Sequence, residues 1–291
     1  MKKFLSLFLA ATLLMSLGSA FALNKGDARA VIGADLTAAQ KASVYKTFGI
    51  EPGAVTELGV TNAEEREYLN GLVDPALIGS RSISSVYIEI LGAGDGLKVD
   101  VSNINWCTKE MYVNALVTAG IDDAKLIVTS PIAGISGTAA LTGVYKAYED
   151  ITGEKLDETA KLAGTQELVV TAELADQIGS LDAVAIVNEL KLILDETINM
   201  TDEELKAEIL SIAKEYDISL SDGQLNSLVS LCRSLEHLNP EELKAKVEGL
   251  QNTITKLAGA KEAVSGVVET VKNFFQSVGD FFSNLFGGSN K

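Results

Sequence analysis

The pattern of hydrophobic and polar positions divides the chain into two parts. Between residues 24 and 155, short apolar runs alternate with amphipathic segments, and glycine, proline and small polar residues separate them. From residue 160 to 286 the apolar positions recur almost wholly with a helical period. We therefore predict an α+β fold, with a mixed sheet and helices over 24–155, an all-α helical bundle over 160–258 and an amphipathic C-terminal helix over 260–286.

In the first part, β-rich runs predict strands, and cap residues and glycines delimit the helices between them. The predicted strands are Ala28–Ala34, Val55–Val60, Ser85–Leu91, Leu97–Ile104 and Lys125–Thr129. The predicted helices are Ala38–Phe48, one that begins at Thr61 or Asn62, one capped by Thr108 that ends at Gly120, and one from Ser136 or Thr138 to about Ile151. Because three glycines lie within Gly92–Gly96, the two strands beside this segment are predicted to form a hairpin.

In the second part, cap residues mark successive helix starts. Asp182 begins a helix that runs to Ile198, and further helices follow Thr201, Ser221 and Asn239-Pro240. From Leu243 the apolar residues recur in alternating steps of four and three, which is typical of a bundle seam. Flanking positions lack the complementary charges of a free coiled-coil dimer, so a bundle seam is favoured.

The C-terminal segment carries five of the nine phenylalanines of the chain. On a helix its apolar residues fall within one arc of about 140°, which must be covered by something. Three covers are possible: the protein's own helical domain, a lipid surface or another envelope protein, and a second copy. The predicted contact residues are Val267, Val271, Phe274, Phe275, Val278, Phe281, Phe282, Leu285 and Phe286.

Residues 1–22 have the features of a secretory signal peptide, with Lys2 and Lys3 before a short apolar run and small residues at Ala20 and Ala22. Cleavage after Ala22 predicts a secreted or cell-envelope protein. Loss of the two lysines takes the formal net charge from −16 to −18. So acidic a protein repels phosphate backbones, and nucleic acid is not expected as a partner.

The residues for common catalytic chemistries are scarce. His237 is the single histidine, and Cys107 and Cys232 are either one disulfide or two separately buried thiols. We therefore assign no catalytic residue, no metal ligand and no cofactor. The sequence does not decide whether the protein is an enzyme, but it favours a protein without enzymatic activity.

Four further features have a structural and a functional interpretation. The Ser136-Gly137-Thr138 turn is either a hydroxyl-capped helix start or an anion site. Arg81, among several serines, either pairs with Glu64 or Glu67 or binds a carboxylate or sugar. Trp106 is either part of the core or a ligand platform. Paired acids such as Glu64 and Glu65 are either a solvated helix face or the carboxyls of a glycoside hydrolase.

The region from Asn62 to about Glu149 resembles the YpuA-like family of secreted proteins of unknown function from Gram-positive bacteria. The segments that carry the resemblance are Thr61–Leu69, Ile78–Tyr87, Asn105–Gly120 and Ser136–Gly143. The resemblance implies export and a two-part build, and it implies no activity, site residue or cofactor. Two functions are weighed: a non-enzymatic envelope or extracellular interaction protein that uses its C-terminal helix, and a cell-wall-directed hydrolase or small-ligand-binding protein that uses acids of the first domain.

Overall fold

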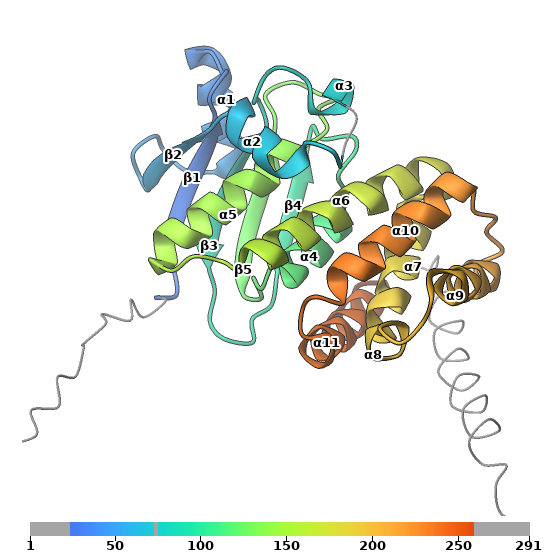
Figure 1. Cartoon of the computed structure of the whole chain (residues 1–291). Helices are drawn as coiled ribbons and strands as arrows, with labels where there is room; N and C mark the ends of the chain where they lie inside the picture. The colour runs from blue at the N-terminus through green and yellow to red at the C-terminus, as the bar shows by residue number, and fades with distance from the viewer. Residues whose placement is uncertain (1–23, 73–74, 259–291) are drawn as a thin grey trace, which may run out of the picture.

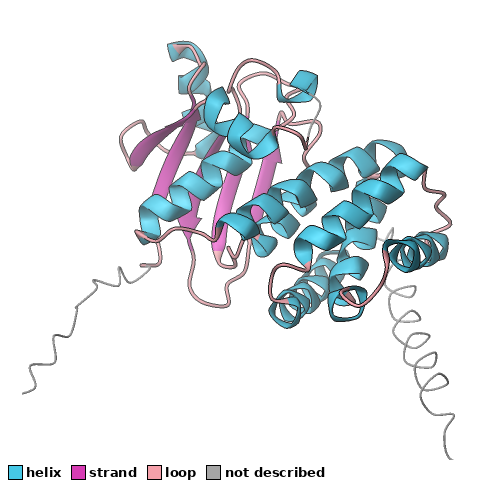
Figure 2. Cartoon of the chain, viewed as in Figure 1, coloured by secondary structure: helices cyan, strands magenta, loops and turns pink. Residues whose placement is uncertain are grey.

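A computed structural model describes residues 24–72 and 75–258 (Figure 1). A five-stranded sheet with covering helices forms one end of the molecule, and a group of helices forms the other (Figure 2). This arrangement confirms the α+β fold. The predicted signal peptide, 1–22, and the predicted C-terminal helix, 260–286, lie outside the described residues.

The sheet is mixed and has the strand order β2-β1-β3-β5-β4. β3 is antiparallel to both of its neighbours, β1 and β5, whereas β1 pairs with β2 and β5 with β4 in parallel. The strands are β1 Ala28–Gly33, β2 Thr56–Val60, β3 Ser85–Ile90, β4 Lys98–Ser102 and β5 Ala124–Thr129. All five predicted strands are therefore present, with bounds within about two residues of those expected.

The predicted hairpin between β3 and β4 is wrong, because β5 lies between these strands. Val128 of β5 is opposite Val86 of β3 on one side and Val101 of β4 on the other. β5 is the more apolar strand, with Leu126 and Val128 fully buried, and so it takes the interior place. In β4, Lys98 and Asp100 are exposed, as suits an edge strand. A glycine-rich turn shows that the chain turns, but it does not fix which strand becomes the neighbour.

Helices cover both faces of the sheet. On one face, α4 (Lys109–Thr118) and α5 (Thr138–Thr152) bury Val31, Val86 and Val128, with α2 (Asn62–Leu69) packed on α5. On the other, α1 (Ala38–Phe48) places Val44, Tyr45 and Phe48 against β1 and β3. A short helix, α3 (Pro75–Ile78), precedes β3.

The second part consists of helices whose starts largely follow the predicted caps. Capping boxes at Thr201 and Ser221 begin α9 (Asp202–Glu215) and α10 (Asp222–Leu235), and Pro240 begins α11 (Pro240–Ala258). The helix predicted over Asp182–Ile198 is instead two helices, α7 (Ser180–Leu192) and α8 (Leu194–Thr197). The break falls at Ile193, whose φ of −112° and ψ of 14° leave helical geometry.

The seam predicted from Leu243 onward belongs to the helical core over the residues whose side chains are described. Leu243 and Val247 are buried and Leu250 is partly buried in the cluster that α7, α9 and α10 form. The side chains of Ile254 and Leu257 lie outside the description.

The longest described helix, α6 (Glu158–Ile178), lies along helices of both parts (Figure 1). Its Leu168, Val169 and Ala172 join the core beneath the sheet, while Ala163 and Leu174 join the helical core. The predicted division between residues 155 and 160 falls in the connection from α5 to α6. Whether the two parts are separate domains stays a prediction.

Candidate functional site

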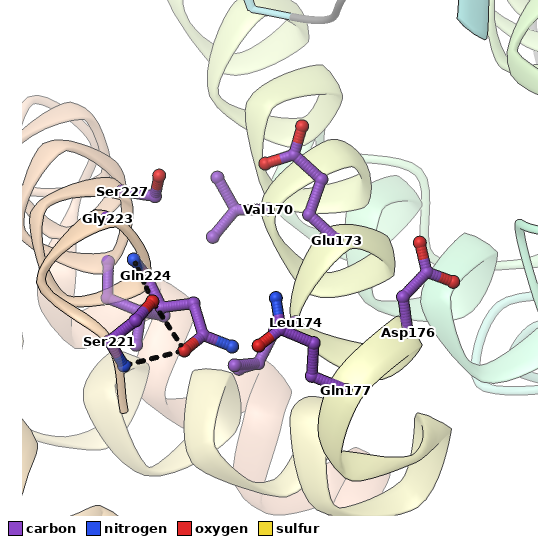
Figure 3. Close-up of a pocket in the computed structure, with 10 residues that line it drawn as sticks. Val170, Glu173, Leu174, Asp176, Gln177, Ser221, Gly223, Gln224 and Ser227 are labelled. Carbon is purple, nitrogen blue, oxygen red and sulfur yellow. Dashed lines mark hydrogen bonds between the residues drawn. The ribbon is translucent and has the colours of Figure 1, made fainter. Parts of the chain in front are cut away.

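A pocket of about 440 Å³ opens between α6 and the first turns of α10 (Figure 3). Apolar side chains lie between the two helices, and carboxylates, amides and hydroxyls surround them. The pocket is lined by Val170, Glu173, Leu174, Asp176, Gln177, Ser221, Gly223, Gln224, Ser227 and Leu228. A volume of this size lies within the range of small-molecule sites.

The α10 side of the pocket is fixed by a capping box. The Ser221 hydroxyl accepts from the Gln224 backbone N–H, and the Gln224 side-chain oxygen accepts from both the backbone N–H and the hydroxyl of Ser221. These bonds set the orientation of the Gln224 amide, because the opposite orientation would place its NH₂ group against the Ser221 donor. The Gln224 Nε2 atom is shielded from solvent and has no hydrogen-bond partner among the described residues.

The α6 side of the pocket carries two carboxylates one turn apart, Glu173 and Asp176. Glu173 is half-buried, and its burial, with a smaller effect of the Asp176 charge, raises its pKa. Asp176 Oδ2 accepts a hydrogen bond from the Trp106 indole nitrogen at 3.2 Å. Within 24–72 and 75–258, no ion pair or hydrogen bond engages the Glu173 carboxylate, so it is available to a ligand cation.

The other end of the contact between α6 and α10 is closed by polar side chains. Gln166 donates to the Ser230 hydroxyl at 3.0 Å and accepts from the Ser234 hydroxyl at 2.6 Å. The two helices are therefore joined at this end and open at the other, where the pocket lies.

Glu64, Arg81 and Trp106 each had a structural and a functional interpretation in the sequence, and the structure shows the surroundings of all three. Glu64 is bound to Lys146 and to its own capping threonine, Thr61, and Arg81 is exposed. Trp106 is 9% exposed and belongs to the core, as its structural interpretation predicts. None of these residues lines the pocket between α6 and α10.

Groups of the Ser136-Gly137-Thr138 turn form hydrogen bonds with other residues of the protein. Thr138 donates to the buried carboxylate of Glu65, and the Tyr112 hydroxyl donates to the Gly137 carbonyl at 2.6 Å. Gly137 has a φ of 98°, and an added Cβ would lie 2.5 Å from the Tyr112 hydroxyl. A carboxylate beside the turn opposes an anion there, so the geometry favours a tight structural turn over an anion site. The predicted hydroxyl cap is wrong, because Gly137 is the N-cap of α5 and no side chain caps this helix.

The two cysteines are free, separately buried thiols. Burial raises the pKa of both, to about 11 for Cys232, so neither has the lowered pKa of a reactive thiolate. Across the described part of the chain, no three His, Cys, Asp or Glu side chains are grouped so that they could hold a metal ion.

The sequence interpretation missed Glu173, Asp176 and Gln224 as candidate residues. Only the capping box at Ser221 was visible in advance, and there Gln224 has an ordinary structural role. Acids three residues apart on a helix are common on solvated faces. A pocket arises here because a segment about 50 residues further along the chain packs beside them.

A strongly perturbed carboxyl lies outside the pocket, on α7. Glu189 is 1% exposed, and its burial raises its pKa to about 7, although the Tyr216 hydroxyl donates to it and opposes the shift. Its Oε2 atom has no partner among the described residues.

We expect Glu189 to lower the stability of the fold as the pH rises. The unfolded carboxyl ionises near pH 4.5, whereas the buried one resists ionisation up to about pH 7. The folded state therefore loses stability across this window, by on the order of 3 kcal/mol in total. Glu189→Gln removes the titration, so its stability relative to wild type should rise between pH 4 and pH 8 in urea unfolding. Glu203→Gln, at an exposed position on α9, is the control. Equal pH profiles for wild type and Glu189→Gln would contradict this expectation.

The fold defines an α+β protein that has a sheet part, a helical part and a pocket between α6 and α10. The described residues contain no recognisable catalytic constellation. Residues 32–257 match the family described as "Protein of unknown function (DUF1002)", and the chain belongs to this family. It is 38% identical over 264 residues to the uncharacterized protein YpuA of Bacillus subtilis (strain 168), covering 90% of this chain and 88% of that protein. No solved structure matches the chain.

None of the described helices combines the length and the apolar character needed to cross a membrane.

Proposed function

We propose that this protein is exported and acts as a non-enzymatic interaction protein of the envelope or extracellular space. Its contact element is the Phe-rich segment that follows α11, with Phe274, Phe275, Phe281, Phe282 and Phe286 on one predicted face. Its partner is a lipid surface or another envelope protein that covers this face.

The observation that carries the proposal is that the heptad pattern of apolar residues extends to both sides of residue 258. Before it, Leu243, Val247 and Leu250 are taken up by the helical core against α7, α4 and α8. After it, the same register continues from Val264 to Leu285. The described part of α11 already packs on this core, and we propose that the later stripe has a different cover.

The alternative, a hydrolase or small-ligand-binding protein that uses acids of the first domain, has weaker support. Glu64 is engaged by Lys146 at 2.5 Å, and Glu65 is buried and bonded to Thr138 and Asn62. Two acids held in this way are poorly placed to reach a substrate.

The double variant Phe275→Asp/Phe282→Asp tests the proposal. Burying an apolar side chain of this size contributes roughly 1.5–3 kcal/mol, so two charges on the stripe should abolish binding to its cover. We expect release from the membrane fraction, with unchanged thermal stability and unchanged mass of the purified protein.

The control is Gln276→Asp/Ser283→Asp, which adds the same charges seven residues apart on the predicted polar face. A loss of thermal stability in the Phe variant would instead place the segment in the protein's own core. A change from oligomer to monomer would make it a subunit interface. If fractionation, stability and mass all stay the same, the stripe is not a contact surface.

A further inference from the structure

We propose that the pocket between α6 and α10 binds a ligand that carries an ammonium group and a carbonyl oxygen joined by an aliphatic chain, as lysine does. Free lysine and a lysine residue of a peptide share this chemistry. The inference is independent of the Phe-rich segment, because it rests on described residues of two other helices.

The ammonium end is recognised by Glu173. Glu173 lines the pocket, and Val170 lies between its carboxylate and the Ser227 side chain in the view of Figure 3. Partial burial and the nearby charge of Asp176 both disfavour its ionised form. A cation beside Glu173 would remove this penalty, and a hydroxyl oxygen is a second acceptor for an N–H donor.

The carbonyl end is recognised by Gln224. The capping box fixes its Oε1 atom on Ser221, and its Nε2 donor is buried without a partner among the described residues. The amide extends from α10 toward α6 (Figure 3). Because a buried donor without a partner is costly, a ligand acceptor gains from pairing with it once the side chains that shield this nitrogen move aside.

The chain between the two ends is accommodated by apolar residues. Val170, Leu174 and Leu228, all of them buried, are the apolar residues that line the pocket. Each methylene group that a lysine side chain buries along such an apolar surface adds to the affinity.

The charge of the protein favours this ligand over an anionic one. The chain has a formal net charge of −16, and no lysine or arginine lines the pocket. A long-range negative field raises the local concentration of cations.

Isothermal titration of the full-length protein with four probes distinguishes the parts of the proposal. The probes are free L-lysine, a Gly-Lys-Gly peptide with blocked ends, the same peptide acetylated on the lysine amine, and 1,5-diaminopentane. We expect the blocked peptide or free lysine to bind, and the acetylated peptide and the diamine to bind at least tenfold more weakly. Binding of free lysine alone identifies the amino acid as the source, and binding of the blocked peptide identifies a polypeptide.

Two variants test which residue binds each end of the ligand. Glu173→Gln removes the charge with little change in shape and should weaken lysine binding at least tenfold. Gln224→Glu keeps the acceptor of the capping box but replaces the free donor with an oxygen, so it should abolish the preference for lysine over the diamine. Glu203→Gln, an exposed acid on α9, controls for net charge.

The proposal is overturned if neither lysine probe binds up to about 10 mM, a concentration that corresponds to very weak affinity. It is also overturned if Glu173→Gln and Glu203→Gln change the affinity equally. The Phe variants should leave these titrations unchanged, so failure here and failure of the proposed function are separate results.

Discussion

Replacing Lys191 with methionine is expected to lower the free energy of unfolding by about 3–5 kcal/mol. Lys191 of α7 is fully buried, and its Nζ atom lies 2.6 Å from Glu167 Oε1 on α6 and 3.2 Å from Thr118 Oγ1 on α4. Burial lowers the pKa of Lys191, which Glu167 opposes. Without the lysine, a buried carboxylate keeps only the Thr118 hydroxyl as a partner.

Urea unfolding followed by circular dichroism measures this loss, which is a large part of the 5–15 kcal/mol that stabilises an ordinary domain. The control is Lys191→Met/Glu167→Gln, which removes both charges and leaves an amide oxygen for Thr118. It should recover at least half of the lost stability, because no buried charge remains unpaired. If the single and double variants are equally destabilised, packing around Lys191 and not the ion pair is responsible.

The second large effect is expected for Gly164→Ala, where α6 crosses α4. A Cβ at this position would lie 2.5 Å from the Ala115 carbonyl oxygen and 3.0 Å from the Tyr145 hydroxyl. The backbone of α4 cannot move aside without disturbing the sheet it covers, so we expect a loss of about 1–3 kcal/mol. Gly223→Ala is the matched control, since its nearest atom would be Ser221 Oγ at 3.9 Å.

The unfolding of Gly164→Ala also reports on the two predicted domains. Trp106, the single tryptophan, lies in the sheet core and donates to Asp176 of α6, so its fluorescence follows the contact between the two parts. If the parts are separate domains, the fluorescence transition should come before the loss of helical circular dichroism in this variant. Coincident transitions would indicate one cooperative unit. Stability equal to that of wild type would contradict the close approach of α4 and α6.

Local sequence signals predicted the helices and strands well, but they predicted less well which of them pack or pair with one another. Capping boxes at Thr61, Thr201 and Ser221 are satisfied within four residues, so they appear as predicted. Neighbours in the sheet depend on burial across the whole layer, and there β5 displaced β4 from the side of β3. The break at Ile193 likewise follows from the packing of α7 and α8 against α10 and α11, which no local pattern shows.

The sequence by itself determined the strands, most helix starts and the acidic charge, because each depends on neighbouring residues or on composition. Only the tertiary structure decided the strand order, the buried pair of Lys191 and Glu167, and the pocket of Glu173 and Gln224. Those features join residues 24 to 51 positions apart, or strands far apart in the chain. Packing brings such residues together. Burial then makes an unpaired charge or hydrogen-bonding group on a lysine, glutamate or glutamine costly, which it is not on a solvated helix.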